Sequence, residues 1–445
     1  MAEATLFEKI WAQHEVAGLP GGASLLHVDR HLIHDLEAGP GLRRLSERGL
    51  KVARPDLTFA TPDHALASAP GARADPSSKG GLLLRDMRTL GSAAGIRVFD
   101  VGKPGQGIVH VMGPELGITL PGTLIVCPDS HTCTHGGLGA LAFGIGSSEV
   151  LHVLATQTIR QTRPQTMRIR FDGALGAGVT AKDMILHAIG VVGTAGGRGY
   201  AVEYAGETVR GLSVESRLTL CNLSIELGAK IGMVAPDDTA FEFVANRPYA
   251  PQGAAFDQAV AAWRALAGDQ AARFDKDVSI DAAAIAPQVT WGTSPEQVAP
   301  VTDAVPGPPA SASAEARRAH MAALDYMGLE PGQRLAGTPV DWVFIGSCAN
   351  SRLPDLRDAA RIVNGRKVAP GVRAWVIAGS ENTRREAEAE GLDRVFTEAG
   401  FEWRAPSCSL CLGANGDFVP PGQRCISTSN RNFVGRQGPG ARTHL

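Results

Sequence analysis

The chain has 445 residues, of which 44% are hydrophobic and 20% charged, so a sizeable core is available without disulfides or structural metals. Its 43 basic and 45 acidic side chains give a formal net charge of −2, which offers no support for binding to nucleic acids or to membrane surfaces. No apolar run reaches the length of a membrane helix, and the N-terminus mixes acidic residues into an amphipathic pattern, so we expect a cytoplasmic protein.

Short β-rich runs alternate with helical patterns along the chain. Strands are predicted at residues 24–28, 122–127, 166–171, 341–346 and 373–379. Helices are predicted at residues 147–161, 181–190, 257–268, 355–363 and 385–391. The helix at 181–190 begins with a capping box, formed by Thr180 and Asp183. This alternation is typical of α/β layers with largely parallel sheets.

The composition changes once along the chain. Pro, Ala and Ser displace any periodicity at residues 299–313, which predicts a linker. The remainder, 314–445, has the size of one domain. The part before the linker is long enough for two more domains, which we place at 1–125 and 126–298, although no shift in composition marks their boundary.

Three cysteines of the C-terminal part are suited to hold a metal centre. Cys348 lies in VFIGSCANSR, where a predicted strand runs into a turn and then a helix, so its sulfur would lie at a strand's carboxyl end. Cys408 and Cys411 have the C-x-x-C spacing, which lets two sulfurs reach one centre. Cys221, in contrast, is interpreted as a buried apolar residue.

The cysteines alone leave three kinds of centre open. A structural zinc site would need a fourth ligand, which Cys425 could supply. An electron-transfer iron–sulfur cluster would also need four cysteines. Three cysteines with one open iron would instead bind a substrate oxygen as a Lewis acid.

Residues 126–150 form a second segment rich in polar side chains and glycine. Asp129, Ser130 and His131 directly follow a predicted strand and would project from its carboxyl end. A G-x-G-x-x-A pattern begins at Gly137, but a long polar stretch separates it from that strand. We therefore expect these glycines to permit close packing and a tight turn. We do not expect zinc at His131, Cys133 and His135, because the surrounding sequence offers no helical frame.

Further acids, bases and amides stand in similar loops. They are Asp63, His64, His110, Asn222, Glu226, Asn430, Arg431 and Arg436. An adjacent Asp and His, as in ATPDHALAS, can tune a proton donor. The two arginines of STSNRNFVGRQG suit a carboxylate clamp, or alternatively a solvated basic loop.

Taken together and in this order, the segments resemble the aconitase superfamily, and most closely its family of bacterial isopropylmalate dehydratase large subunits. The matching motifs span nearly the whole chain and include DRHLIHD, FATPDHALAS, QGIVHVMGPE, DSHTCTHGGLGALAFGIGSSEV, LCNLSIELGAK, FIGSCANSR, CSLCLGAN and STSNRNFVGRQG. The resemblance implies an α/β fold of three related α/β/α domains around an iron–sulfur cluster.

The resemblance also implies roles for particular residues. It carries the cluster ligands over onto Cys348, Cys408 and Cys411, which implies a [4Fe–4S] cluster with three cysteine ligands and one open iron. It implies catalytic roles for Asp63, His64, His110, Asp129, Ser130, His131 and Glu226. It implies substrate-binding roles for Asn222, Asn430, Arg431 and Arg436.

For function, the resemblance implies a hydro-lyase that isomerises 2-isopropylmalate to 3-isopropylmalate in leucine biosynthesis. In this family a small, swivelling subunit carries a serine base in a G-S-S-R-E type loop. The GSSEV run at residues 146–150 lacks the arginine, and we reject it as that base. We therefore expect a small-subunit partner and a small dicarboxylic hydroxy acid as substrate, with no nucleic acid and no membrane.

Two other readings stay open. A homoaconitase or a citraconate or dimethylmalate hydratase subunit would share these motifs, because selectivity for the substrate side chain in this group lies largely on the small subunit. A regulatory or electron-transfer iron–sulfur protein is disfavoured by the absence of a fourth cluster cysteine and by the neutral charge balance.

Overall fold

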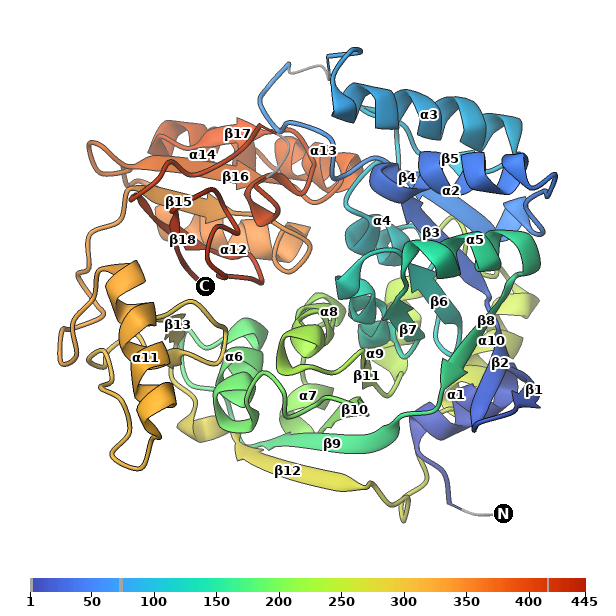
Figure 1. The fold of residues 1–445 in the computed structure, drawn as a ribbon, viewed down its shortest axis with the longest axis horizontal. Coiled ribbons are helices and arrows are strands. Elements are labelled where there is room, and N and C mark those ends of the chain that lie inside the picture. Colours follow the sequence, from blue (N-terminus) through green and yellow to red (C-terminus); the bar gives the residue numbers. More distant parts are fainter. Residues whose placement is uncertain (1–2, 72–74, 414–415) are drawn as a thin grey trace.

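The computed structural model describes residues 3–71, 75–413 and 416–445. Three parallel sheets, each accompanied by helices, surround a common centre (Figure 1). This arrangement confirms the predicted α/β class with largely parallel sheets. Within the described ranges, no helix is both long and apolar enough to cross a membrane.

The first sheet has the strand order β5-β4-β3-β6-β7. Its strands are β3 (Arg30–His34), β4 (Thr58–Thr61), β5 (Arg97–Val98), β6 (Leu124–Cys127) and β7 (Leu141–Gly144). The same part of the chain forms the helices α2 (Asp35–Glu47), α3 (Lys79–Ala93), α4 (Val109–Glu115) and α5 (Ser147–Thr156) and the 3₁₀ segments η1 (Pro55–Leu57) and η2 (Ser130–Leu138). A smaller antiparallel sheet joins β1 (Glu15–Leu19), β2 (Ala23–His27) and β8 (Thr158–Thr162), next to helix α1 (Leu6–His14).

The second sheet has the order β11-β10-β9-β12. Its strands are β9 (Gln165–Asp172), β10 (Tyr200–Ala205), β11 (Ile231–Val234) and β12 (Lys276–Asp281). The same part of the chain forms the helical elements α6 (Ala181–Val192), α7 (Glu207–Arg210), α8 (Val214–Asn222), η3 (Leu223–Leu227), α9 (Asp238–Val244), α10 (Ala254–Arg264) and η4 (Ala282–Ala284). The predicted capping box is present at the start of α6, where Asp183 accepts hydrogen bonds from the Thr180 backbone and hydroxyl, both 2.7 Å.

The third sheet has the order β17-β16-β15-β18-β19. Its strands are β15 (Trp342–Ile345), β16 (Arg373–Ile377), β17 (Glu402–Arg404), β18 (Arg424–Ser427) and β19 (Arg442–His444). Its helical elements are α12 (Leu353–Val363), α13 (Glu381–Ala389), α14 (Leu392–Ala399) and η5 (Ser409–Cys411). A short antiparallel pair, β13 (Gln288–Thr290) and β14 (Val298–Pro300), and helix α11 (Ala314–Met327) precede this sheet in the chain.

The first sheet takes strands from both sides of residue 125. β6 pairs in parallel with β3, and β7 pairs in parallel with β6. Strand β8 then returns to pair with β2. We therefore propose that the first domain ends between Thr162 and Gln165, later than the boundary expected from the sequence, because the strands of one sheet belong to one folding unit.

Residues 301–313, within the expected linker, contain no helix or strand. The segment is nevertheless anchored at its middle. Val305 is only 2% exposed and belongs to a cluster with Trp291 and Leu324. We propose that this segment is a fixed connection between the second and third sheets and not a flexible tether.

The buried carboxyl of Glu203 on β10 yields a prediction about stability and pH. One of its oxygens has no hydrogen-bond partner among the described residues, and burial raises its pKa from 4.5 to about 7 against the opposing charges of Arg168 and Lys9. The folded chain therefore binds the Glu203 proton more tightly than the unfolded chain does. The free energy of unfolding consequently falls as the pH rises from the pKa of this carboxyl in the unfolded chain towards its pKa in the folded chain. At about pH 8 we expect Glu203→Gln to raise the free energy of unfolding by about 3 kcal/mol.

Urea unfolding of the wild type and of Glu203→Gln at two pH values checks this expectation. At about pH 4.5 the wild-type carboxyl is protonated in the folded chain, and the two proteins should have nearly equal stability. An equal difference at both pH values would contradict the assignment.

Candidate active site

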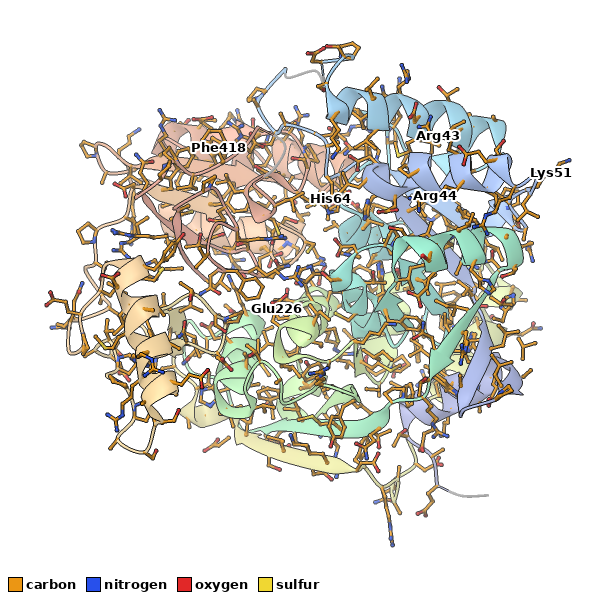
Figure 2. All side chains as sticks on the ribbon, in the orientation of Figure 1. Arg43, Arg44, Lys51, His64, Glu226 and Phe418 are labelled. Carbon is orange, nitrogen blue, oxygen red and sulfur yellow. The ribbon has the colours of Figure 1, made fainter. Side chains whose placement is uncertain are left out.

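Polar side chains from all three sheets gather at the centre of the molecule. Asp129 follows the end of β6, and Cys348 and Asn430 follow the ends of β15 and β18. His64 and Glu226 lie in the same central region (Figure 2). The location matches the rule that ligands bind beyond the carboxyl ends of parallel strands.

His64 lies between two carboxylates. Its Nδ1 is 2.5 Å from Asp63 Oδ1, and its Nε2 is 3.4 Å from Asp129 Oδ2. Burial alone would lower the pKa of His64, but the two carboxylates outweigh burial and raise that pKa well above 6.5. His64 is therefore a buried imidazolium at neutral pH, which is the state that a proton donor needs.

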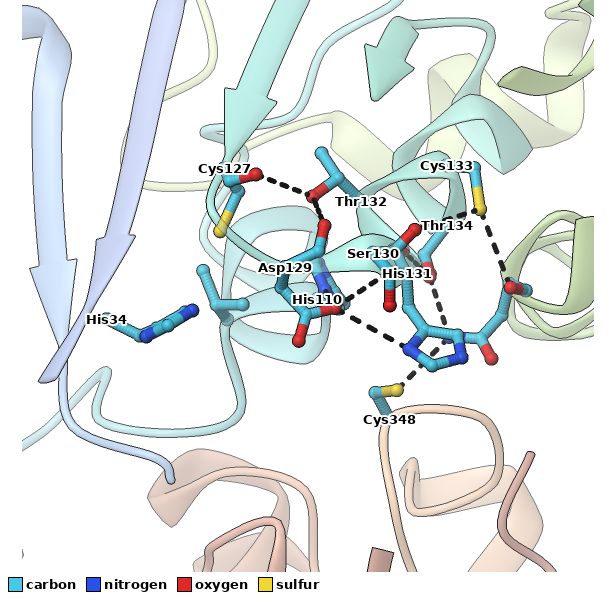
Figure 3. Close-up of polar contacts among 12 residues, drawn as sticks. His34, His110, Cys127, Asp129, Ser130, His131, Thr132, Cys133, Thr134 and Cys348 are labelled. Carbon is cyan, nitrogen blue, oxygen red and sulfur yellow. Dashed lines mark hydrogen bonds and ion pairs between the residues drawn. The ribbon is translucent and has the colours of Figure 1, made fainter. Parts of the chain in front are cut away.

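His110 is held in the opposite protonation state. Burial lowers its pKa below 6.5, although its Nε2 is only 2.8 Å from Asp129 Oδ1. Its Nδ1 is 3.1 Å from Nε2 of His135, whose own Nδ1 is 2.7 Å from the Thr119 hydroxyl. Since Asp129 can only accept, the direction of the chain is fixed: Thr119 donates to His135, His135 to His110, and His110 to Asp129. Figure 3 shows the contact between His110 and Asp129.

The third histidine, His131, extends the same network, because its Nδ1 is 3.6 Å from Asp129 Oδ1 and its backbone N–H donates to that oxygen at 2.7 Å. His131 Nε2 is 3.0 Å from Glu226 Oε1, which also accepts a 2.7 Å hydrogen bond from Arg431 Nε. Arg431 Nη2 donates to Ser130 Oγ at 3.0 Å. Burial would raise the pKa of Glu226, but His131 and Arg431 lower it, so Glu226 is ionised. The network links residues from all three sheet regions.

Two asparagines connect the cysteine sulfurs to this centre. Asn222 Nδ2 and Asn430 Nδ2 each lie 3.2 Å from Cys348 Sγ. Cys411 Sγ is 3.4 Å from Asn430 Oδ1, and Asn430 donates to Asn222 Oδ1 at 3.0 Å. Cys408 is tied to the first sheet, because its backbone N–H donates to the Asp63 carbonyl at 2.8 Å. The structure thus brings Cys348, Cys411 and both asparagines together.

The cysteine loops contain strained backbone. Ser347, immediately before Cys348, has φ 72°, and Ser409, immediately after Cys408, has φ 42°. Positive φ is unfavourable for residues with a β-carbon and is found preferentially at functional sites. Both loops are therefore held in place by the structure around them.

The donor set fits an iron–sulfur cluster better than a single zinc ion. Cys348, Cys408 and Cys411 are buried and form no disulfide. They do not form a group whose ligand atoms all lie within 4.8 Å of one another, whereas sulfurs on one tetrahedral zinc would be about 4 Å apart. Cys425, the alternative fourth zinc ligand, lies fully buried in an apolar cluster with Trp342. Its Sγ contacts the Ile426 carbonyl at 3.5 Å.

One compact group of possible ligand atoms does occur among the described residues, formed by His34, Asp35, Asp63 and His64. Its oxygens already have partners. Asp35 accepts hydrogen bonds from the backbone N–H groups of Asp63, His64 and Ala65, at 2.5–3.1 Å. The carboxylate of Asp35 therefore fixes the loop that carries the Asp63–His64 pair, and we interpret the group as a hydrogen-bond network.

A buried ion pair fixes the C-x-x-C loop. Asp417 accepts hydrogen bonds from Ser68 Oγ at 2.7 Å and from Ser409 Oγ at 2.9 Å. Arg404 Nη2 donates to the second oxygen of Asp417 at 2.9 Å, and Arg404 Nε donates to Ser68 Oγ at 2.7 Å. Asp417 thus connects the loop around Cys408 to the first sheet region.

We expect Asp417→Asn to lower the free energy of unfolding of the cluster-free chain by about 3 kcal/mol, because among the described residues the buried Arg404 then keeps a carboxylate partner only in the exposed Glu402. Urea unfolding measures the difference. The matched control is Asp358→Asn, which breaks an exposed pair with Arg361 and should change stability by less than about 1 kcal/mol. Equal effects of the two substitutions would contradict the role assigned to Asp417.

The weaker sequence patterns are also accounted for. A β-carbon on Gly137 would lie 2.6 Å from the backbone nitrogen of Leu218, and Gly139 takes φ 78° at a turn, so these glycines allow close packing as expected. His131 and His135 point to different partners, Glu226 and His110. In GSSEV, the Ser147 hydroxyl donates to Glu37 at 2.9 Å, so it does not contact the central residues.

One predicted residue stands apart, and two residues were missed. The Arg436 guanidinium makes no hydrogen bond to the other site residues that the structure describes, and its buried Nε has no partner there. Lys182 donates to the Ser427 carbonyl at 2.9 Å, and burial lowers its pKa to about 7. Arg352 is buried beside Cys348. Lys182 lies in the helix predicted at 181–190 and Arg352 lies in the quoted motif FIGSCANSR, and these patterns are the only sequence signal for them.

The site and the fold agree with comparisons to known proteins. The model of the aconitase family (aconitate hydratase) matches residues 8–445, and the chain belongs to this family. The chain is 64% identical over 441 residues to 3-isopropylmalate dehydratase large subunit 1 of Bradyrhizobium diazoefficiens, covering 99% of this chain and 92% of that relative.

A solved structure shares the fold. The holo-form crystal structure of Thermococcus kodakaraensis aconitase X has a TM-score of 0.50 and 12% sequence identity, covering 92% of this chain and 84% of that one. At this identity the likeness supports the overall fold alone.

Proposed function

We propose that the chain is the large subunit of a cytoplasmic 3-isopropylmalate dehydratase, a hydro-lyase that isomerises 2-isopropylmalate to 3-isopropylmalate by removing and re-adding water. The observation that carries this proposal is the juxtaposition of buried cysteine thiols with one charged and one neutral histidine around Asp129. The 64% identity to a relative of that name supports the choice of substrate.

For the cofactor, we infer a [4Fe–4S] cluster bound by Cys348, Cys408 and Cys411, with one iron left without a protein ligand. When bound, this cluster supplies a Lewis-acidic iron for the hydroxyl and carboxylate oxygens of the substrate. Asn222 and Asn430 donate hydrogen bonds to Cys348 Sγ, an interaction that stabilises a thiolate and orients it.

His64 is the proposed proton donor to the leaving hydroxyl. Expulsion of hydroxide is unfavourable, and a positioned imidazolium lowers the barrier by delivering a proton as the C–O bond breaks. Asp63 keeps His64 charged and fixes its ring at 2.5 Å. Asp129 connects His64 to the neutral His110, so the two histidines and Asp129 form one proton network.

The substrate is a dicarboxylate, and the chain offers two arginines for it. Arg431 is already oriented by Glu226 and Ser130. Arg436 has a buried Nε without a partner among the described residues, so this N–H is available to donate to a substrate carboxylate. His131 completes the network, because its Nε2 lies 3.0 Å from the same Glu226 oxygen that accepts from Arg431.

Removal of the carbon-bound proton needs a base that we assign to a small-subunit partner with a serine in its loop. In GSSEV, the Ser147 hydroxyl donates to Glu37 at 2.9 Å, and no hydrogen bond among the described residues joins it to the acid–base network. Substrate binding and protonation of the leaving group thus belong to this chain, and proton abstraction belongs to the partner.

One set of experiments tests the cofactor, the source of the base and the substrate separately. Purified alone without oxygen, the chain should bind iron and sulfide but leave 2-isopropylmalate unchanged, and adding a small subunit should start turnover. Assays with homoaconitate and dimethylmalate in parallel identify the preferred substrate by kcat/KM. Turnover by the chain alone would place the base in this sequence, and stoichiometric zinc in anaerobic preparations would overturn the cluster.

A further inference from the structure

Arg352 occupies an unusual position for a charged side chain. It immediately precedes helix α12, lies four residues after Cys348, and is only 5% exposed. Its backbone N–H donates to Asp355 Oδ2 at 2.9 Å, which fixes the start of the helix. The guanidinium points away from this cap, back towards the cysteine loop.

The guanidinium is bound by carbonyl groups from two sheet regions. Nη1 donates to the Ala349 carbonyl at 2.8 Å, and Nη2 donates to the Cys348 carbonyl at 3.1 Å. Nη2 also donates to the His110 carbonyl at 3.3 Å. One side chain therefore connects the cysteine loop of the third sheet to helix α4 of the first.

The burial of the Arg352 charge indicates that this contact does more than stabilise the fold. Among the described residues, no carboxylate oxygen lies within 4.0 Å of the Arg352 guanidinium. Burial lowers the pKa of Arg352, as expected for a cation taken out of water without a close ion pair. An apolar side chain would fill the same space without this unfavourable desolvation, but it would not hold three carbonyl groups in fixed orientations.

We propose that Arg352 is a positioning residue that sets the placement of His110 relative to the cysteine loop. This inference rests on the proposed function and adds to it a residue that touches neither substrate nor cluster. Holding both carbonyls with one planar donor fixes the spacing of the two elements, and His110 is thereby aligned with Asp129.

The surroundings of Arg352 make the proposal testable. Its Nε is buried without a partner beside a cavity of about 210 Å³, which is also lined by Val111, Leu353 and Arg357. Arg357 is 43% exposed, so the cavity reaches the surface, and a small solute has a route to the position of the guanidinium. Arg357 itself pairs with Glu390 and provides a matched control on the same helix.

The experiment compares Arg352→Lys, Arg352→Ala and the control Arg357→Ala in the iron-loaded chain with its small subunit. For Arg352→Lys we expect unchanged iron content, a KM within threefold of the wild type and a kcat lowered by about 100-fold, since a displacement of about 1 Å suffices for such a loss. Methylguanidinium should restore part of the kcat of Arg352→Ala, whereas methylammonium should not. Arg357→Ala should stay within twofold of the wild type.

A second readout does not depend on activity. In the cluster-free chain labelled with ¹⁵N-histidine, the imidazole signals of His110 should shift in Arg352→Lys and stay in place in Arg357→Ala. Assignment comes from His110→Gln. If Arg352→Ala does not fold, the comparison of Arg352→Lys with the control decides alone.

Three results would overturn the proposal. They are a kcat of Arg352→Lys within threefold of the wild type, a loss of kcat that merely follows loss of iron, and failure of Arg352→Lys to fold, which would make the arginine a folding residue. Failure of the proposed function is distinct, because the wild-type complex itself would then not convert isopropylmalate.

Discussion

Cys348→Ser, Cys408→Ser and Cys411→Ser are each expected to reduce bound iron more than about tenfold and to abolish isomerisation, because a serine hydroxyl is a far weaker iron ligand than a thiolate. Iron and sulfide analysis of anaerobically purified protein measures the first effect, and the visible absorbance of the cluster measures it independently. The three variants should behave alike, since each removes one of the three proposed ligands.

Cys425→Ser is the matched control for these substitutions. Cys425 is fully buried in the apolar cluster around Trp342 and pairs through β18 with β15, so its replacement should cause some loss of stability but no loss of iron. Loss of iron from Cys425→Ser at an unchanged melting temperature would contradict the assignment of three ligands.

His64→Ala is expected to lower kcat by about 10³-fold while complex formation with the small subunit and iron content stay unchanged. In the proposed mechanism the imidazolium acts on the leaving oxygen in the transition state, so its removal should affect kcat far more than binding. Steady-state kinetics of the reconstituted complex and sedimentation of the two chains measure the two quantities.

His152→Ala provides the control for this prediction, because His152 is exposed on helix α5 and, within the described part of the chain, its Nε2 hydrogen-bonds only to Thr158, at 3.4 Å. Asp63→Asn should give a smaller loss than His64→Ala, since the ring is kept but loses the carboxylate that charges and orients it. Equal activities of His64→Ala and His152→Ala would show that His64 takes no part in the reaction.

Much of the secondary structure around the site was predictable from local sequence patterns. Strands expected at residues 122–127 and 341–346 are present as β6 and β15, and Asp129 and Cys348 stand beyond their carboxyl ends as expected. These features depend on short apolar runs and on the turn that follows, both of which are visible in a sequence. Helix α6 and its capping box were predictable for the same reason.

Features that depend on packing between distant segments were not predictable. The helix expected at 147–161 ends at Thr156, because Gln157 adopts a left-handed conformation and β8 follows, pairing with β2. The burial of Arg352 arises only when α4 meets the cysteine loop. From the sequence alone, an arginine beside the start of a helix is expected to be exposed to solvent.

The distribution of the site over the chain has a consequence for biogenesis. All three proposed cluster thiols belong to the third sheet region, whereas the acid–base residues Asp63, His64, His110 and Asp129 all belong to the first. The proposed iron ligands and the proton network therefore form in separate regions, and a molecule whose regions have folded but not docked could bind iron while its active site is still incomplete. Metal loading would then mark an early stage of maturation, and docking of the first region on the third, through contacts such as that of Asp417 with Ser68, would be the step that makes the loaded chain competent.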